Sequence, residues 1–240
     1  SSFTNCLKNA AYQFYNKHED GQRYIIAGYP WFNYRARDLF ISLPGLTISA
    51  KDPELFDAIM DTGLKAIVNF IEKKPLDCAI SGMEDPDVLL WAVWSVQEYA
   101  KYNGLNKCFD KYGKVVFDII EFIRKQKHDN LFLHENGLLY TKGHEKPVSW
   151  INSVINGKPV TPRSGYLVEF NALWYNTLLF GIELSEFSEK KYHLNSYKKL
   201  ADKTKNSFIE VFLNQHGYLY DYVDNNNPDW SVRPNMIFAA

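Results

Sequence analysis

The clearest pattern in the chain is a run of apolar residues at helical spacing behind Asp52-Pro53. Aspartate caps helix N-termini, and proline is well tolerated at the first helical position. The apolar residues behind this pair recur at i, i+3 and i+4, which places them on one face of a helix: Phe56, Ile59, Met60, Gly63, Leu64, Ile67, Val68 and Ile71. The sequence therefore predicts an amphipathic helix that runs from Pro53 to about residue 71.

Four more helices are predicted from similar patterns, over about 87–102, around 115–123, near 169–186 and near 191–214. The first 28 residues predict short strands and turns, and a segment rich in Gly, Pro and polar residues predicts a long loop over 129–168. A short hairpin at 216–221 and a turn at 225–228 follow. Long loops in compact domains are usually functional. Paired helices that alternate with loops favour an all-α barrel or toroid, with the loops forming a pocket at one end.

Composition narrows the class of protein. The chain has 240 residues, of which 46% are hydrophobic, and this length predicts one domain over residues 1–240. A net charge of −1 gives no electrostatic case for nucleic acid or an anionic membrane surface, and no apolar run approaches the length of a membrane span. The odd number of cysteines, without paired spacing, predicts neither disulfides nor zinc. It favours a reducing compartment, and we expect a cytoplasmic protein.

The most informative segment is Tyr29–Asp38, which packs aromatics, two arginines and an acid just before a helical pattern. Aromatic faces such as that of Trp31 can cover the apolar side of a pyranose, while Arg37 and Asp38 can share its hydroxyls in charge-assisted bonds. The alternative is a helix entry in which Trp31 and Phe32 are buried in the core. The segment alone does not decide between a sugar site and a core.

Three further clusters join an aromatic residue to an arginine, an amide or an acid. They supply Trp150 and Asn152 from segment 148–152, Arg163, Glu169, Asn171 and Trp174 from segment 161–176, and Arg233 from segment 229–235. Each one alone is also explained by a capped helix with a buried tryptophan. The chain has no metal-ligand motif, no phosphate-binding glycine loop and no nucleophile elbow. We therefore expect no cofactor and no metal, and paired carboxylates favour glycoside hydrolysis.

Glu169 is the candidate general acid, because it opens a helix among Phe170, Leu173 and Trp174. Apolar surroundings would raise the pKa of its carboxyl, as a proton donor requires, whereas the helix N-terminus would lower it. The alternative is a first-turn glutamate that completes a helix cap. Asp38 is likewise either a first-turn acid of a helix or a ligand of the sugar.

With these residues in place, the chain resembles the amylo-α-1,6-glucosidase region of glycogen debranching enzymes. The matching motifs occur in order and span residues 27–240. They are Ala27-Gly-Tyr-Pro-Trp-Phe32, Arg37-Asp38, Ser42-Leu-Pro-Gly45, Asp87-Val-Leu-Leu-Trp91, Pro159 to Arg163, Val168 to Asn176, Gly217 to Asp221 and Arg233 to Asn235.

The resemblance implies an (α/α)₆ barrel that hydrolyses α-1,6-linked glucose in glycogen or another branched α-glucan. It also implies an inverting mechanism, in which two carboxylates stand about 6.5–9.5 Å apart and admit a water. Arg37 and Asp38 would hold the terminal glucose.

Two departures from the family pattern matter. The family carries Thr-Trp-Met-Asp, whose aspartate is the expected acid, where this chain has Ser149-Trp-Ile-Asn152. An amide cannot donate that proton, so Asn152 could only position substrate. The chain also ends before the last barrel helices, which leaves the barrel incomplete and places the expected base beyond residue 240.

These departures leave three hypotheses. The first is a debranching hydrolase in which Glu169 replaces the missing acid. The second is a non-catalytic α-glucan-binding fragment, or a degenerate homologue, with Asn152 at the acid's position. The third is a helical scaffold for proteins, against which the clustered Trp and Arg residues argue. The sequence does not predict the oligomeric state.

Overall fold

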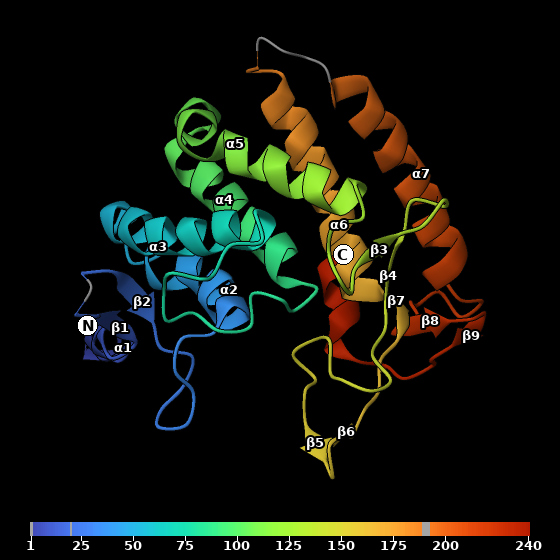
Figure 1. Cartoon of the computed structure of the whole chain (residues 1–240), viewed down its shortest axis with the longest axis horizontal. Helices are drawn as coiled ribbons and strands as arrows, with labels where there is room; N and C mark the ends of the chain where they lie inside the picture. The colour runs from blue at the N-terminus through green and yellow to red at the C-terminus, as the bar shows by residue number, and fades with distance from the viewer. Residues whose placement is uncertain (1, 20, 189–192) are drawn as a thin grey trace. The chain divides into compact units, whose positions relative to one another are not determined.

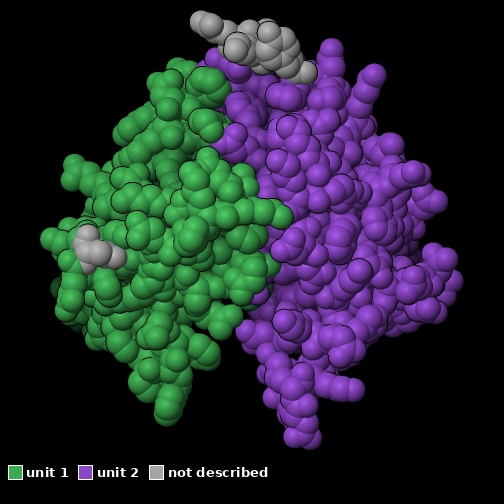
Figure 2. Space-filling model, in the orientation of Figure 1, with its two compact units in different colours: residues 1–84, 91–115 green, residues 85–90, 116–240 purple. Residues whose placement is uncertain are grey.

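The computed structural model describes residues 2–19, 21–188 and 193–240. Its α-helices hold about half of the residues, and its strands are short. The chain forms two compact units, coloured separately in Figure 2. Unit 1 comprises residues 1–84 and 91–115, and unit 2 comprises residues 85–90 and 116–240. The division falls inside two helices, α4 (Val88–Asn103) and α5 (Leu105–Arg124).

Unit 1 begins with helix α1 (Ser2–Tyr12) and an antiparallel pair of strands, β1 (Tyr15–Lys17) and β2 (Arg23–Ile25). Helices α2 (Ala36–Leu46) and α3 (Pro53–Ile71) follow and pack against each other, as the blue and cyan helices of Figure 1 show. Gly63 lies at their contact, where a Cβ atom would stand 2.8 Å from the ring of Phe40. The glycine therefore allows a close approach of the two helices.

Aromatic rings fill the core of unit 1. Tyr99 contacts Phe56 and Tyr112, with ring centroids 5.0 and 5.1 Å apart. The Tyr112 hydroxyl donates a hydrogen bond of 2.6 Å to Asp57. Burial, together with the Asp57 carboxylate, raises the pKa of Tyr112. The ring is therefore buried while its polar end keeps a partner.

Unit 2 combines helices α6 (Val168–Ser185) and α7 (Leu194–Phe212), which lie side by side (Figure 1), with an antiparallel sheet of order β3-β4-β7-β8-β9. The strands of this sheet are β3 (Phe132–Leu133), β4 (Leu139–Thr141), β7 (Gly165–Leu167), β8 (Tyr222–Asp224) and β9 (Asn227–Pro228). Strands β5 (Val154–Ile155) and β6 (Lys158–Pro159) form a separate antiparallel pair. A 3₁₀ helix, η2 (Pro234–Ala239), follows the last strand. Leu138, Val168, Phe212 and Val223 form a buried apolar cluster that joins the sheet to the helices.

The periodic segments are confirmed as helices. Helix α3 has the predicted bounds, and the Asp52 carboxylate accepts a 2.9 Å hydrogen bond from the Leu55 backbone N–H. Helices α4 and α6 lie within one residue of their predicted ranges. Helix α7 spans 194–212 against the predicted 191–214, of which 191 and 192 lie outside the described residues. The turn at 225–228 is also confirmed, since Asn225 and Asn226 adopt positive φ between β8 and β9.

Three predictions need correction. Residues 2–12 form helix α1 rather than strands and turns. Its Phe3, Cys6, Leu7 and Ala10 follow the helical period, although the helix buries none of its residues. Helix α5 starts at Leu105, well before the apolar run at 115–123. The segment 129–168 contains strands β3 to β7 rather than one long loop, because strands of two or three residues are too short to show alternation. The fold is thus largely helical but not all-α. The (α/α)₆ toroid and the single domain stay predictions.

Candidate functional site

A buried cluster of charged side chains centres on Arg163 in unit 2. Its Nη1 and Nη2 atoms donate to the two carboxylate oxygens of Glu169 at 2.5 and 2.7 Å. Its Nε and Nη2 atoms donate to Asp221 at 2.7 and 3.0 Å. The three side chains are only 1%, 2% and 0% exposed, respectively. One guanidinium therefore bridges two buried carboxylates with bidentate geometry, the strongest form of this contact.

Two glycines let the backbone bring these residues together. Arg163 lies just before β7, Glu169 lies in the first turn of α6, and Asp221 lies just before β8. A Cβ atom on Gly143 would stand 1.7 Å from the Arg163 carbonyl oxygen, and one on Gly165, whose φ is +97°, would stand 2.2 Å from a β8 carbonyl. Only glycine permits such approaches, so both positions are needed for the local sheet geometry.

Among the described residues, Glu169 pairs with Arg163 alone, whereas Asp221 is also bonded by Arg233. Burial raises the pKa of the Glu169 carboxyl, and the Arg163 guanidinium acts in the opposite direction. Burial alone would lower the pKa of Arg163, but its bonds to Glu169 and Asp221 outweigh burial and raise it. Arg163 is therefore permanently charged, while Glu169 is harder to ionise than a surface glutamate.

The cluster extends outward from Asp221 to the surface. Arg233 donates to Asp221 at 2.8 Å and to Asp229 at 2.7 Å. The Asn235 amide nitrogen donates to Asp221 at 2.6 Å, and the Asn235 amide oxygen accepts from the Trp150 indole N–H at 2.7 Å. Trp150 is 51% exposed. The half-exposed aromatic face of Trp150 can stack on a sugar ring, and the partly exposed Arg233 and Asp229 of the same cluster can bind its hydroxyls.

Asp229 is the partly exposed carboxylate of this edge. Burial acts to raise the pKa of Asp229, but hydrogen bonds from Ser231 and Arg233 outweigh burial and lower it. Asp229 is therefore ionised at neutral pH, which suits a hydroxyl acceptor or a base and not a proton donor.

The structure brings together four of the predicted site residues of unit 2: Trp150, Arg163, Glu169 and Arg233. Asn152 is exposed, two residues beyond Trp150. Asn171 and Trp174 lie in the interior, each 0% exposed. The Asn171 amide bonds to the backbone of β4 and of β7, at Leu139 and Leu167, so it ties the sheet to helix α6.

The predicted residues of unit 1 lie at the start of α2. Trp31 is 82% exposed and Phe32 is 52% exposed, so the interpretation of both as core residues is wrong. Arg37 is buried, whereas the Asp38 side chain is 45% exposed in the first turn of the helix, with the Arg35 Nε atom 3.9 Å away. An exposed aromatic face and an accessible carboxylate therefore occur within one short segment.

Sequence reasoning missed Asp221, Asp229 and Asn235 as individual site residues. Asp221 and Asn235 end two of the motifs that carry the family resemblance, and Asp229 and Asn235 are the ends of the aromatic cluster 229–235. A buried carboxylate needs a charged partner, and the buried partner of Asp221, Arg163, is 58 positions away in the chain. Periodicity and local motifs do not report such a distant pairing.

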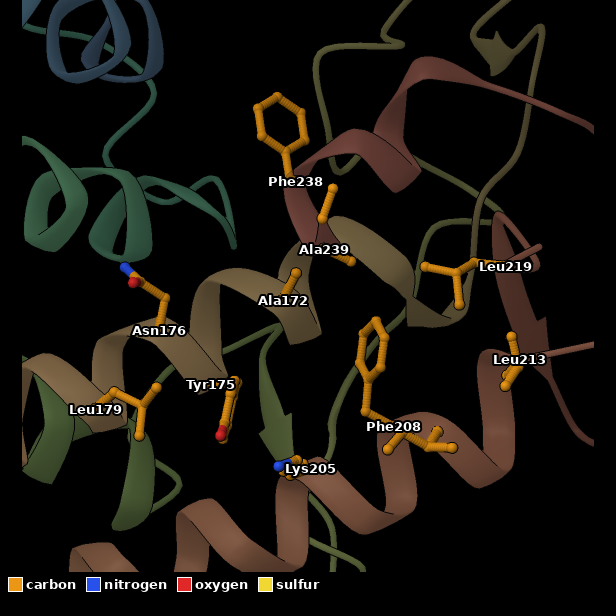
Figure 3. Close-up of a pocket in the computed structure, with 12 residues that line it drawn as sticks. Ala172, Tyr175, Asn176, Leu179, Lys205, Phe208, Leu213, Leu219, Phe238 and Ala239 are labelled. Carbon is orange, nitrogen blue, oxygen red and sulfur yellow. The ribbon is translucent and has the colours of Figure 1, made fainter. Parts of the chain in front are cut away.

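Unit 2 also has a pocket of about 490 Å³ between α6, α7 and the C-terminal residues. Figure 3 shows Tyr175 on α6, Phe208 on α7 and Phe238 near the C-terminus around it. Its lining is mostly apolar, with Lys205 as its charged side chain and no carboxylate side chain. Its lining therefore lacks the paired carboxylates of glycoside hydrolysis and includes no residue of the Arg163 cluster.

Comparisons with known proteins identify a family. The sequence profile of the family described as amylo-alpha-1,6-glucosidase matches residues 9–240. No protein with a curated description matches the chain. Across the described residues, no helix is long and apolar enough to cross a membrane. Within the same residues, no three His, Cys, Asp or Glu side chains are grouped so that they could hold a metal ion.

Proposed function

We infer that this chain, which belongs to the amylo-α-1,6-glucosidase family, is a glycosidase-type domain that binds branched α-glucan at the solvent edge of the Arg163 cluster. The reaction that we propose is hydrolysis of α-1,6-linked glucose in glycogen or a limit dextrin. A cytoplasmic location is part of the same proposal.

One observation carries the assignment of the site. Three motifs that are far apart in the sequence converge on Asp221: the segment of Trp150, the segment of Arg163 and Glu169, and the segment of Arg233. The convergence leaves the indole of Trp150 half exposed and Arg233 about a quarter exposed. These are the groups that a sugar requires, an apolar face for its C–H side and charged partners for its hydroxyls.

Hydrolysis also requires a proton donor. Asn152 occupies the position of the family's acid and cannot donate in that role, so we propose Glu169 as the acid. The raised pKa of its buried carboxyl supports this role. Both of its oxygens bond to Arg163, so donation requires Arg163 to release one of them.

These same contacts favour a second candidate function, which is binding of α-glucan without hydrolysis. In that case Glu169 serves to neutralise Arg163, and the exposed amide of Asn152 contributes only a hydrogen bond to the sugar. The two functions share one binding site and differ only in whether a proton donor is present.

The test is glucose release from a glycogen limit dextrin, with binding of maltotetraose measured in parallel by calorimetry. Hydrolysis that Glu169→Gln abolishes without loss of binding supports Glu169 as the acid. Hydrolysis that survives Glu169→Gln contradicts that role.

Binding without hydrolysis supports the second candidate, and Asn152→Asp then asks whether restoring the carboxyl restores the reaction. Absence of both binding and hydrolysis contradicts the proposed function as a whole.

A further inference from the structure

We propose that Asp221 is a positioning residue that fixes the indole ring of Trp150 for stacking on a glucan, with Asn235 as the link between them. This inference rests on the proposed function, because it concerns how the same site holds its sugar. Asp221 is 0% exposed and so does not touch a ligand itself.

The direction of the link follows from the chemistry of a carboxylate. Ionised Asp221 only accepts hydrogen bonds, so the Asn235 amide must turn its nitrogen toward Asp221. That orientation leaves the amide oxygen facing Trp150, whose indole N–H can only donate. The charge on Asp221 therefore dictates which end of Asn235 meets the indole.

Asp221 is itself held rigidly. Arg163 Nε and Arg233 Nη1 both donate to its Oδ2 atom, while Arg163 Nη2 and Asn235 donate to its Oδ1 atom. Four charge-assisted contacts on one buried carboxylate leave it a single orientation. Asn235 is also 0% exposed, so its amide is fixed by packing as well as by its two bonds.

In the link from Asp221 through Asn235 to Trp150, the indole of Trp150 is the part that reaches solvent. It lies in an irregular segment between β4 and β5, and it is 51% exposed. Without a fixed partner such a ring samples several rotamers, and the entropy lost when the ring is ordered weakens ligand binding. The bond to Asn235 orders the ring before the sugar arrives, and the ring can then present one face to the pyranose.

A double-mutant cycle with Asn235→Ala and Trp150→Phe tests the link. Phenylalanine keeps an aromatic face but has no N–H. Because position 150 is half exposed, we expect the Trp150→Phe change to have little effect on stability. We expect Asn235→Ala to weaken maltotetraose binding about tenfold in the wild-type background, which is the size of one hydrogen bond. In the Trp150→Phe background the same change should have no further effect.

Asn214→Ala is the matched control. Asn214 is also buried in unit 2, and its amide oxygen accepts from the backbone of His216 and Tyr218 in a turn. This variant should lose stability much as Asn235→Ala does, without weakening maltotetraose binding. An Asn235→Ala effect that persists undiminished in the Trp150→Phe background would overturn the proposal.

A second measurement does not depend on binding. The Trp150 indole N–H resonance, assigned by its loss in Trp150→Phe, should shift in Asn235→Ala and in Asp221→Asn but not in Asn214→Ala. If the alanine variant does not fold, the same resonance is measured in Asn235→Ser, which keeps a polar group at the site. An unshifted resonance overturns the positioning role, whereas a shifted resonance in a protein that binds no glucan overturns only the proposed function.

Discussion

At the scale of single residues, Arg163 is the buried cation that bridges two carboxylates in unit 2. Its three nitrogens all donate to buried acceptors, which are Glu169, Asp221 and the Ser149 hydroxyl. A buried ion pair is costly to form, but removal of one partner is costlier still, because it leaves an uncompensated charge in the interior. Here the loss of Arg163 would leave Glu169 without a cation among the described residues and Asp221 with Arg233 alone.

We therefore expect Arg163→Met to destabilise the protein by about 3–5 kcal/mol, measured by urea denaturation. Lys101→Met is the control, because Lys101 pairs with Glu98 on the surface and its side chain is 64% exposed. That variant should lose no more than about 1 kcal/mol. Equal losses in the two variants would show that the Arg163 cluster has no special energetic role.

At the scale of elements, helix α3 shows how local signals define a boundary. Proline occupies its first position, where no intrahelical N–H partner is needed, and the Asp52 carboxylate accepts from Leu55 N–H. Its predicted start is confirmed because both signals lie within three residues of the helix end. The short strands of unit 2 lack any comparable local signal, since they are defined by partners elsewhere in the chain.

Asp52→Ala should lower stability by about 1 kcal/mol, because it removes the cap of α3. Thermal unfolding followed by circular dichroism should show a decrease in Tm of about 2–4 °C. Asp52→Asn retains a capping oxygen and should behave nearly as the wild type does. A decrease of the same size in both variants would argue that the negative charge, and not the cap, matters.

At the scale of the whole molecule, exposed aromatic faces beside charged side chains occur in both units. Unit 2 carries the Arg163 cluster with Trp150, and unit 1 carries the exposed Trp31 with Asp38 at the start of α2. The role of the unit 1 segment stays a prediction, and a substitution confined to that unit tests it.

Asp38→Asn should weaken maltotetraose binding by about 1.5–3 kcal/mol, which is typical of a lost hydrogen bond to a charged group. Calorimetry measures the affinity, and circular dichroism checks the fold. Asp110→Asn, at an exposed position of α5 in the same unit, should leave the affinity unchanged. Unchanged affinity in a folded Asp38→Asn variant would remove Asp38 from the set of ligand residues.

The sequence by itself determined the periodic helices, the cap of α3, the turn at Asn225-Asn226 and the family. Each of these depends on residues close together in the chain, or on motifs that occur in a fixed order. Only the tertiary structure decided that Trp31 faces solvent while Trp174 is buried, and that Arg163 bridges Glu169 and Asp221. The physical reason is that burial and charge pairing depend on contacts between distant segments, and local patterns carry no record of which distant residue a side chain will meet.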